Sequence, residues 1–222
     1  MVRRAARSRL RRKKGAIVAL YTAPPDGGAV ICLDEMGPES AKSFLGTRVV
    51  RPDPAGERRA RAPQEVDYGR RGSGYVLGAF EPATGKALTA PYAGRTIANW
   101  VDFLGRAEAW IDAGVERVYA VLDNLSTHRA LDVLLWALAH PRWEFVFQPT
   151  AAAYLNLIEP WWKTLRSLAL KGRRFETWAE VCRAVAEGTG YWNAHRHPFV
   201  WGRRQRRRAA RRAGLAVLPV AA

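Results

Sequence analysis

The segment 116–123, ERVYAVLD, restricts the fold of this chain more than any other stretch. Its apolar residues follow one another without alternation, which is typical of a strand buried on both faces in a parallel sheet. Apolar residues at helical spacing occupy 95–113 before it, and a second helix is expected at 127–139 after it. A buried strand between two helices predicts an α/β architecture with a parallel part.

The rest of the chain supplies the other strands of this sheet. Two β-rich runs at 74–80 and 86–92 are separated by EPATG, a spacing that predicts a hairpin. The order β-β-β-α-β-α-β-α-α predicts a mixed five-stranded sheet with helices on both faces. The remaining expected elements are buried strands at 29–35, ending on Asp34 and Glu35, and at 143–150; helices at 155–170 and about 177–193; a short helix or strand at 13–21; and mainly loop at 37–72.

Positive charge is concentrated near the two ends of the chain. The formal net charge is +16, yet residues 1–14 hold eight Lys or Arg, residues 202–212 hold seven, and neither segment contains an acid. Outside these segments, 21 basic residues are balanced by 20 acidic ones. The sequence therefore predicts a nearly neutral folded body with two basic arms, which are either solvated tails or contacts for a polyanion such as nucleic acid.

The composition argues against several classes of protein. Cys32 and Cys182 allow one disulfide but no disulfide framework, and no CxxC is present to bind zinc. His195 and His197 have no cysteine or third histidine near them in the sequence, which favours a structural role. No apolar run has the form of a signal peptide or the length of a membrane span. A protein of the reducing cytoplasm, without a membrane partner, is expected.

Three acidic residues occupy positions where packing alone does not require them. Asp34 and Asp123 are expected at the carboxyl ends of two strands, where functional groups of α/β sheets gather. Glu159 precedes Pro160, which is tolerated in the first turn of a helix, and Asn156 is placed to cap that helix. Singly, each acid could instead serve a turn or a helix cap. Together, three carboxylates directed at one cleft predict two Mg²⁺ or Mn²⁺ ions about 4 Å apart, acting on a phosphodiester.

Five stretches carry a resemblance to a known family: CLDEMGP, GYVLGAFEPATG, VLDNLSTHRA, FQPTAAAYLNLIEPWWKTLRSLALKGRRF and YWNAHRHPFVWGRR. They resemble the catalytic domain of insertion-sequence transposases of the mariner superfamily, which are DDE endonucleases with an RNase H-like fold. The resemblance extends from about residue 15 to 204, and its patterns DNxxxH and NxIEPxW are specific. The 35 residues between Asp123 and Glu159 also fit the spacing common in DDE transposases.

The resemblance implies a site and a reaction. Asp34, Asp123 and Glu159 would be the catalytic triad that binds two Mg²⁺ or Mn²⁺ ions. The family cuts double-stranded DNA at transposon ends, and the freed 3′-hydroxyl attacks target DNA, typically at TA. The same resemblance implies a homodimer acting on two DNA ends, in a nucleoid-associated cytoplasmic protein.

Asn124 and His128, which follow Asp123, are candidates for accessory roles. His128 could orient a water at the metal or contact phosphate, but it could equally be a helix-face histidine that hydrogen-bonds locally. Glu35 is expected to point to the opposite face of its strand from Asp34, because side chains alternate along a strand.

Contacts with DNA are expected mainly from the basic arms. Lys163 lies four residues after Glu159, so an ion pair between them is favoured over a DNA contact. Trp201 is the candidate for base stacking, whereas Trp161, Trp162, Trp178 and Trp192 are expected in the core. The candidate DNA-binding residues are Arg11, Arg12, Lys13, Lys14, Lys163, Arg203 and Arg204.

The expected organisation is a basic arm at 1–14, an RNase H-like DDE catalytic domain at 15–201 and a basic tail at 202–222. Transposases of this kind carry upstream helix-turn-helix units that bind the terminal inverted repeats, and this chain is expected to lack them, so a separate recognition domain is a candidate partner. Two alternatives to an active transposase domain stay open. One is a catalytically idle DNA-binding remnant, and the other is a structure-selective RNase H-like nuclease.

Overall fold

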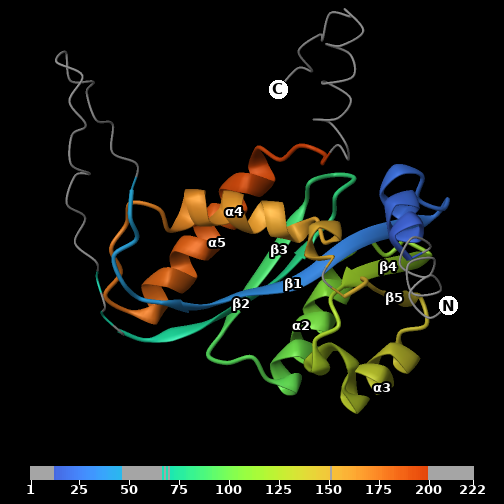
Figure 1. Cartoon of the computed structure of the whole chain (residues 1–222), viewed down its shortest axis with the longest axis horizontal. Helices are drawn as coiled ribbons and strands as arrows, with labels where there is room; N and C mark the ends of the chain where they lie inside the picture. The colour runs from blue at the N-terminus through green and yellow to red at the C-terminus, as the bar shows by residue number, and fades with distance from the viewer. Residues whose placement is uncertain (1–12, 47–66, 68, 70, 151, 200–222) are drawn as a thin grey trace, which may run out of the picture.

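The computed structural model describes residues 13–46, 67, 69, 71–150 and 152–199. Five strands form one sheet in the order β3-β2-β1-β4-β5 (Figure 1). The β1–β2 and β2–β3 pairs are antiparallel, and the β1–β4 and β4–β5 pairs are parallel. The predicted hairpin and mixed five-stranded α/β sheet are therefore confirmed. The strands are β1 (Gly28–Ser40), β2 (Ser73–Phe80), β3 (Ala87–Tyr92), β4 (Arg117–Leu122) and β5 (Trp143–Phe147).

Helices cover both faces of the sheet (Figure 1). One face packs against α2 (Ile97–Trp110) and α3 (Leu131–Ala139), and the other against helical residues 13–22, α4 (Ile158–Ala169) and α5 (Trp178–Ala194). Two short 3₁₀ helices, η1 (Ser126–Arg129) and η2 (Ala153–Leu155), follow β4 and β5. The layered arrangement follows from the sequence, because each helix has one apolar face to bury.

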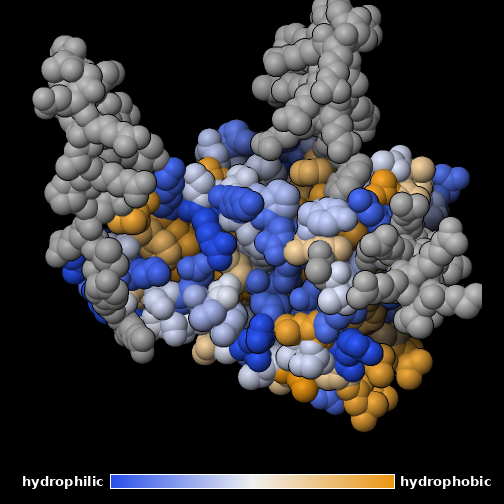
Figure 2. All heavy atoms as spheres, in the orientation of Figure 1, coloured by the Kyte–Doolittle hydropathy of each residue, from blue (hydrophilic) through white to orange (hydrophobic). Residues whose placement is uncertain are grey.

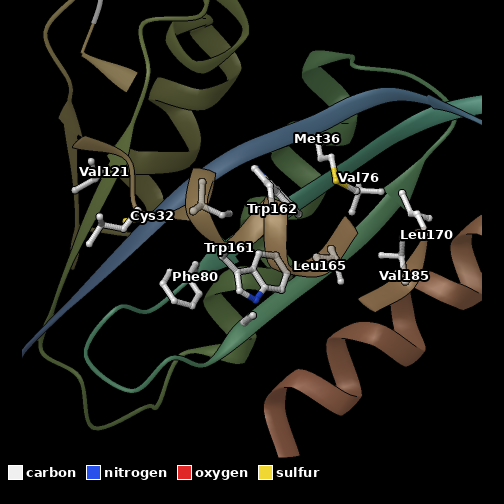
Figure 3. Packing of buried hydrophobic residues seen from close by; sticks show 14 of the residues in the cluster. Cys32, Met36, Val76, Phe80, Val121, Trp161, Trp162, Leu165, Leu170 and Val185 are labelled. Carbon is white, nitrogen blue, oxygen red and sulfur yellow. The ribbon is translucent and has the colours of Figure 1, made fainter. Parts of the chain in front are cut away.

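Side-chain alternation along β1 divides the core into two clusters. Val30 and Cys32 belong to the cluster under α4 and α5, whereas Ile31 and Leu33 belong to the cluster under α2. Figure 3 shows the first cluster, in which Cys32 lies beside Val121 and Phe80 lies by Trp161. Since successive side chains of a strand point to opposite faces, this division fixes which layer each later residue of β1 faces.

A glycine allows α4 to lie close to the sheet. Gly78 of β2 pairs with Asp34 of β1, and a Cβ atom at position 78 would overlap the indole of Trp162 and press on Ile158. Trp162 and its neighbour Trp161 are almost fully buried, and the Trp161 ring stacks on Phe80. Residue 78 must therefore lack a side chain for the start of α4 to reach the part of β1 that carries Asp34.

The strand predicted to end at Asp34 and Glu35 is longer than expected. β1 continues to Ser40, because β2 continues to pair with it from Asp34↔Gly78 to Ser40↔Ser73. The Gly37–Pro38 pair, which reads as a loop signal, lies at an irregularity in this pairing instead of ending the strand. Asp34 is thus inside β1, although the pairing of β1 with β4 ends before it.

Three expectations about the later helices were wrong. The segment expected to be one helix at 127–139 is η1 followed by α3, with Ala130 between them. Leu157, not Asn156, is the N-cap of α4, because the Asn156 side chain donates to β1 instead. Helical spacing also predicts that Leu168 lies on the buried face with Trp161 and Leu165, but Leu168 is 39% exposed and the neighbouring Ala169 is buried instead.

Other expectations about the core and termini had mixed outcomes. Trp161 and Trp162 are buried, Trp178 and Trp192 are partly buried against the same cluster, and Cys32 and Cys182 are both free thiols. None of the helices in the described ranges is long and apolar enough to cross a membrane. Most of the basic arm, the basic tail, Trp201 and much of the segment 37–72 lie outside the described residues.

The outer face of α3 is apolar. Its spacing of three and four residues places the exposed side chains on one side of the helix, and Figure 2 shows the apolar surface at this corner of the molecule. The helix is held to the body by its other side, where Val133 is fully buried. The exposed leucines are Leu131, Leu134, Leu135 and Leu138.

We predict that Gly78→Ala destabilises the protein by about 1–3 kcal/mol, because the added methyl forces α4 away from the sheet. Gly105→Ala is the matched control, since a Cβ atom at this position of α2 meets no other atom. The control is expected to be as stable as the wild type or up to about 1 kcal/mol more stable. Urea denaturation of the three proteins measures both effects, and equal stability of Gly78→Ala and wild type would contradict the close packing of α4.

Candidate active site

Asp34 and Asp123 lie level with each other on neighbouring strands. The parallel register of β1 and β4 runs as far as Cys32↔Val121, and each aspartate lies two residues beyond that pair. Asp123 directly follows the last residue of β4, as predicted, whereas Asp34 is still paired with Gly78 of β2. The register therefore brings both predicted aspartates to one edge of the parallel part of the sheet.

Asn156 connects the start of α4 to Asp34. Its fully buried amide nitrogen donates to the Leu33 carbonyl oxygen at 2.9 Å and lies 3.4 Å from Asp34 Oδ2. The backbone nitrogen of Glu159 in turn donates to the Asn156 carbonyl oxygen at 3.2 Å. This buried amide positions the first turn of α4, and with it Glu159, beside β1.

Glu159 is exposed in the first turn of α4, where the helix dipole favours a carboxylate. Among the described residues its side chain has no hydrogen-bond or ion-pair partner. The ion pair expected with Lys163, which is itself exposed, is not formed. Because the capping-box and ion-pair explanations both fail, the Glu159 carboxylate is available for another ligand.

The three acids are close enough to affect one another. Burial raises the pKa of Asp34 to about 7, the hydrogen bond from the Glu35 backbone nitrogen opposes this rise, and the charges of Glu35, Glu159 and Asp123 add to it. Like charges held together disfavour ionisation of the most buried member. The raised pKa of Asp34 thus reflects its burial first, with a smaller contribution from the neighbouring negative charges.

His128 is buried between two carboxylates. Its Nδ1 lies 2.9 Å from Asp123 Oδ1 and its Nε2 lies 3.4 Å from Glu35 Oε2, both in the geometry of ion pairs instead of linear hydrogen bonds. Burial by itself lowers the pKa of His128, but Asp123 and Glu35 raise it to about 9. The contact with His128 also lowers the pKa of Asp123, against the effect of burial. His128 therefore contacts both a local carboxylate, Asp123, and a distant one, Glu35, and its role at a metal or phosphate stays a prediction.

Three residues that surround His128 were not predicted to do so. Glu35 does face away from Asp34, as alternation requires, but there it contacts His128 and accepts a hydrogen bond from Arg95 at 2.8 Å. Trp100 of α2 packs against the His128 ring, with the two rings tilted by 31° and their centroids 4.1 Å apart. No signal in the sequence links these residues, because 60 or more positions separate Glu35 from Arg95 and His128.

Asn124, the other accessory candidate, contacts the backbone after β5. Asn124 donates from its amide nitrogen to the Gln148 carbonyl oxygen at 2.6 Å, which ties the end of β4 to the residue after β5. Its contact with substrate stays a prediction. The predicted DNA-binding residues Arg11, Arg12, Arg203 and Arg204 lie outside the described residues, while Lys14 lies over the Tyr154 ring. Lys13 is exposed at the start of helical residues 13–22.

The carboxylates of Asp34, Asp123 and Glu159 are suitable ligands for a divalent cation. Carboxylate oxygens are the usual ligands of Mg²⁺ and Mn²⁺, and a cation would offset both the buried charge of Asp34 and the repulsion from neighbouring acids that adds to its raised pKa. In the part of the chain that the structure describes, no three His, Cys, Asp or Glu side chains are already arranged to hold a metal ion. The residues fit the ion by type and location, and the carboxylates must approach further to bind it.

Sequence comparison decides the family. The profile of the DDE superfamily endonucleases matches residues 29–182, which span β1 to the first half of α5 and include all three acids. The chain belongs to the DDE superfamily endonucleases. The family predicted from the sequence motifs is thereby confirmed.

Individual relatives of this DDE endonuclease agree with the family. A 39 kDa protein of insertion element IS630 from Shigella sonnei is 20% identical over 127 residues, which are 57% of this chain and 37% of the relative. The Mos1 transposase paired-end complex with the left transposon end aligns with a TM-score of 0.59 and 13% identity, over 85% of this chain and 54% of that one. The mariner Mos1 paired-end complex with Mg gives a TM-score of 0.56 at 13% identity, over 86% and 62%.

These likenesses confirm the RNase H-like fold of the DDE endonuclease chain. The chain matches only part of each relative's length: little more than a third of the IS630 protein and about half of the Mos1 chain. At 13% identity the Mos1 structures establish the arrangement of strands and helices and nothing further about the site.

We predict that Asp34→Asn stabilises the metal-free protein at pH 8 by about 1–3 kcal/mol. The folded state holds the Asp34 proton with a pKa of about 7 against an ordinary value of 3.8. The folded state therefore binds more protons than the unfolded state between these values, so stability falls as pH rises from about 4 to 7. Asparagine keeps an acceptor for the Glu35 backbone nitrogen but carries no charge.

Urea denaturation in EDTA at pH 5 and pH 8 tests this, and the advantage of the variant should shrink at the lower pH. A variant that is less stable than the wild type at both pH values would contradict the buried-charge account of Asp34.

Proposed function

We propose that this chain is the catalytic domain of a transposase that cuts and joins DNA phosphodiesters, using two divalent metal ions held by Asp34, Asp123 and Glu159. The observations that support the proposal are the register that sets Asp34 level with Asp123 and the Asn156 bond that holds the first turn of α4 beside β1, in a chain of the DDE endonuclease family. The spacing of Asp123 and Glu159 and the NxIEPxW pattern support the same assignment.

Each acid has a distinct position in the proposed reaction. Asp34 is the most buried, and one of its carboxylate oxygens already accepts from the Glu35 backbone nitrogen. Asp123 is partly exposed, and Glu159 is the most accessible of the three. When bound, two divalent cations activate the attacking oxygen and stabilise the leaving oxygen of a phosphodiester. The carboxylates hold these cations at a fixed place in the fold, and Glu159 completes the set from the first turn of α4.

Double-stranded DNA is the proposed partner. One structural relative is described as a paired-end complex with the left transposon end, and the basic segments at the ends of this chain would neutralise phosphates. A homodimer is proposed because joining requires two DNA ends to be held together. Recognition of one end sequence is assigned to a separate domain, since the described residues are used for the sheet and its covering helices. The cell location proposed is the nucleoid of the cytoplasm.

We predict that the purified chain nicks supercoiled plasmid in Mg²⁺ or Mn²⁺. Asp123→Asn and Glu159→Gln should each lower the nicking rate by more than about 100-fold, because loss of residues that only support a metal ligand already costs about 10- to 100-fold. Asp112→Asn, an exposed acid after α2, is the matched control and should keep the wild-type rate. Agarose-gel assays of the four proteins, purified in parallel, measure the rates.

The other outcomes distinguish the competing functions. Equal nicking by wild type and both site variants would reject the proposed site. DNA binding without nicking in any metal would favour a catalytically idle DNA-binding remnant. Cutting restricted to branched or hybrid substrates would favour a structure-selective RNase H-like nuclease.

We predict that the six arginines within residues 1–12 contribute sequence-independent DNA affinity. Replacing them with glutamine should weaken binding and flatten the plot of log affinity against log salt, by about 0.9 in slope for each phosphate that the arm no longer neutralises. The helical body should be unchanged, as circular dichroism can verify. An unchanged slope, from fluorescence anisotropy at several salt concentrations, would show that this arm does not contact DNA.

A further inference from the structure

A series of side-chain contacts connects Asp123 with the layer that contains α2. His128 Nδ1 lies 2.9 Å from Asp123 Oδ1, and His128 Nε2 lies 3.4 Å from Glu35 Oε2. Arg95, which precedes α2, places its NH1 atom 2.8 Å from Glu35 Oε1. The two nitrogens of one imidazole thus connect the end of β4 with β1, and the second oxygen of Glu35 connects β1 with the start of α2.

The imidazole is held in one place. His128 is 1% exposed, and its ring lies against Trp100, which is 2% exposed. The histidine belongs to η1, which lies between β4 and α3 in the chain. A ring packed in this way cannot turn without breaking its contact with Trp100 or with a carboxylate, so its Nδ1 atom is a fixed point beside Asp123.

The Nδ1 atom of His128 contacts one carboxylate oxygen of Asp123, Oδ1. Oδ1 is contacted by His128 Nδ1 and also accepts a hydrogen bond from the Leu125 backbone nitrogen at 2.8 Å. Oδ2 has no hydrogen-bond or ion-pair partner among the residues that the structure describes, and the side chain is 39% exposed. Two contacts on Oδ1 hold the carboxylate plane and leave Oδ2 for a ligand.

We propose that His128 is a positioning residue for Asp123, which it orients through Oδ1 so that Oδ2 binds a divalent cation, with Glu35 and Arg95 holding the histidine in turn. The inference rests on the proposed metal-dependent function. A ligand that is already oriented loses less freedom when the metal binds, and partners that orient ligands typically change metal affinity by about 10- to 100-fold.

Two amide variants of His128 separate positioning from simple packing. The amide nitrogen of asparagine overlaps the place of Nδ1, whereas that of glutamine reaches the place of Nε2. His128→Asn should bind Mn²⁺ within about threefold of the wild type, and His128→Gln should bind about 10- to 100-fold more weakly. His140→Gln is the matched control, because the His140 ring also packs against a tryptophan, Trp136, but lies away from the three acids.

Mn²⁺ binding to the full chain is measured by electron paramagnetic resonance of the free ion, well below the unfolding temperature of each variant. Circular dichroism and thermal unfolding establish that each protein is folded. If neither amide variant folds, His128→Phe, which preserves the ring contact with Trp100, replaces them with the same expected loss as glutamine.

The outcomes distinguish this inference from the proposed function. Wild-type Mn²⁺ affinity in both amide variants, together with loss of binding in Asp123→Asn, would overturn the positioning role alone. Equal weakening of both amide variants would also overturn it, because the effect would then not depend on a donor beside Oδ1. Absence of Mn²⁺ binding in the wild type, or binding that Asp123→Asn does not change, would overturn the metal site and the positioning role together.

Discussion

The parallel pairing of β1 with β4 is the constraint on which the candidate site depends. Both strands are buried on their two faces, so the alternation of their side chains leaves one register in which the core closes. That register sets Asp34 beside Asp123. The third acid needs a second constraint, which Asn156 provides by bonding the start of α4 to β1 and Gly78 provides by giving the indole of Trp162 room.

The distribution of counter-charges around β1 sets Asp34 apart from the other acids of its strand. Glu35 is paired with Arg95, and Glu39, although buried, is paired with Arg166 of α4 at 2.7 Å. Asp34 has no cationic partner among the described residues and lies near further negative charge. The folded state therefore buries a carboxylate without a cationic partner at Asp34, whereas Glu35 and Glu39 each have an arginine partner. An arrangement of this kind is common where a protein holds charges for a ligand.

Sequence reasoning predicted the elements whose pattern is local. The hairpin, the two parallel strands and α2 follow from apolar runs and helical spacing, and Asp123 was placed correctly because a strand visibly ends at it. The second half of β1, up to Ser40, was not predicted because Gly37 and Pro38 suggest a loop. In the structure, pairing with β2 extends the strand past them. The uses of Asn156 and Glu35 could not be predicted, since each depends on a partner 60 to 123 positions away.

Asp34 and Glu35 are neighbours in the chain but serve opposite layers of the molecule. Asp34 contacts Asn156, and Glu35 contacts His128 and Arg95. A slip of β1 by a single residue would exchange these two carboxyl groups between the layers while leaving the composition of the strand unchanged. Insertion or deletion of one residue within this strand should therefore be far more harmful than most substitutions in it. Such a change would move every later side chain of β1 to the opposite face of the sheet.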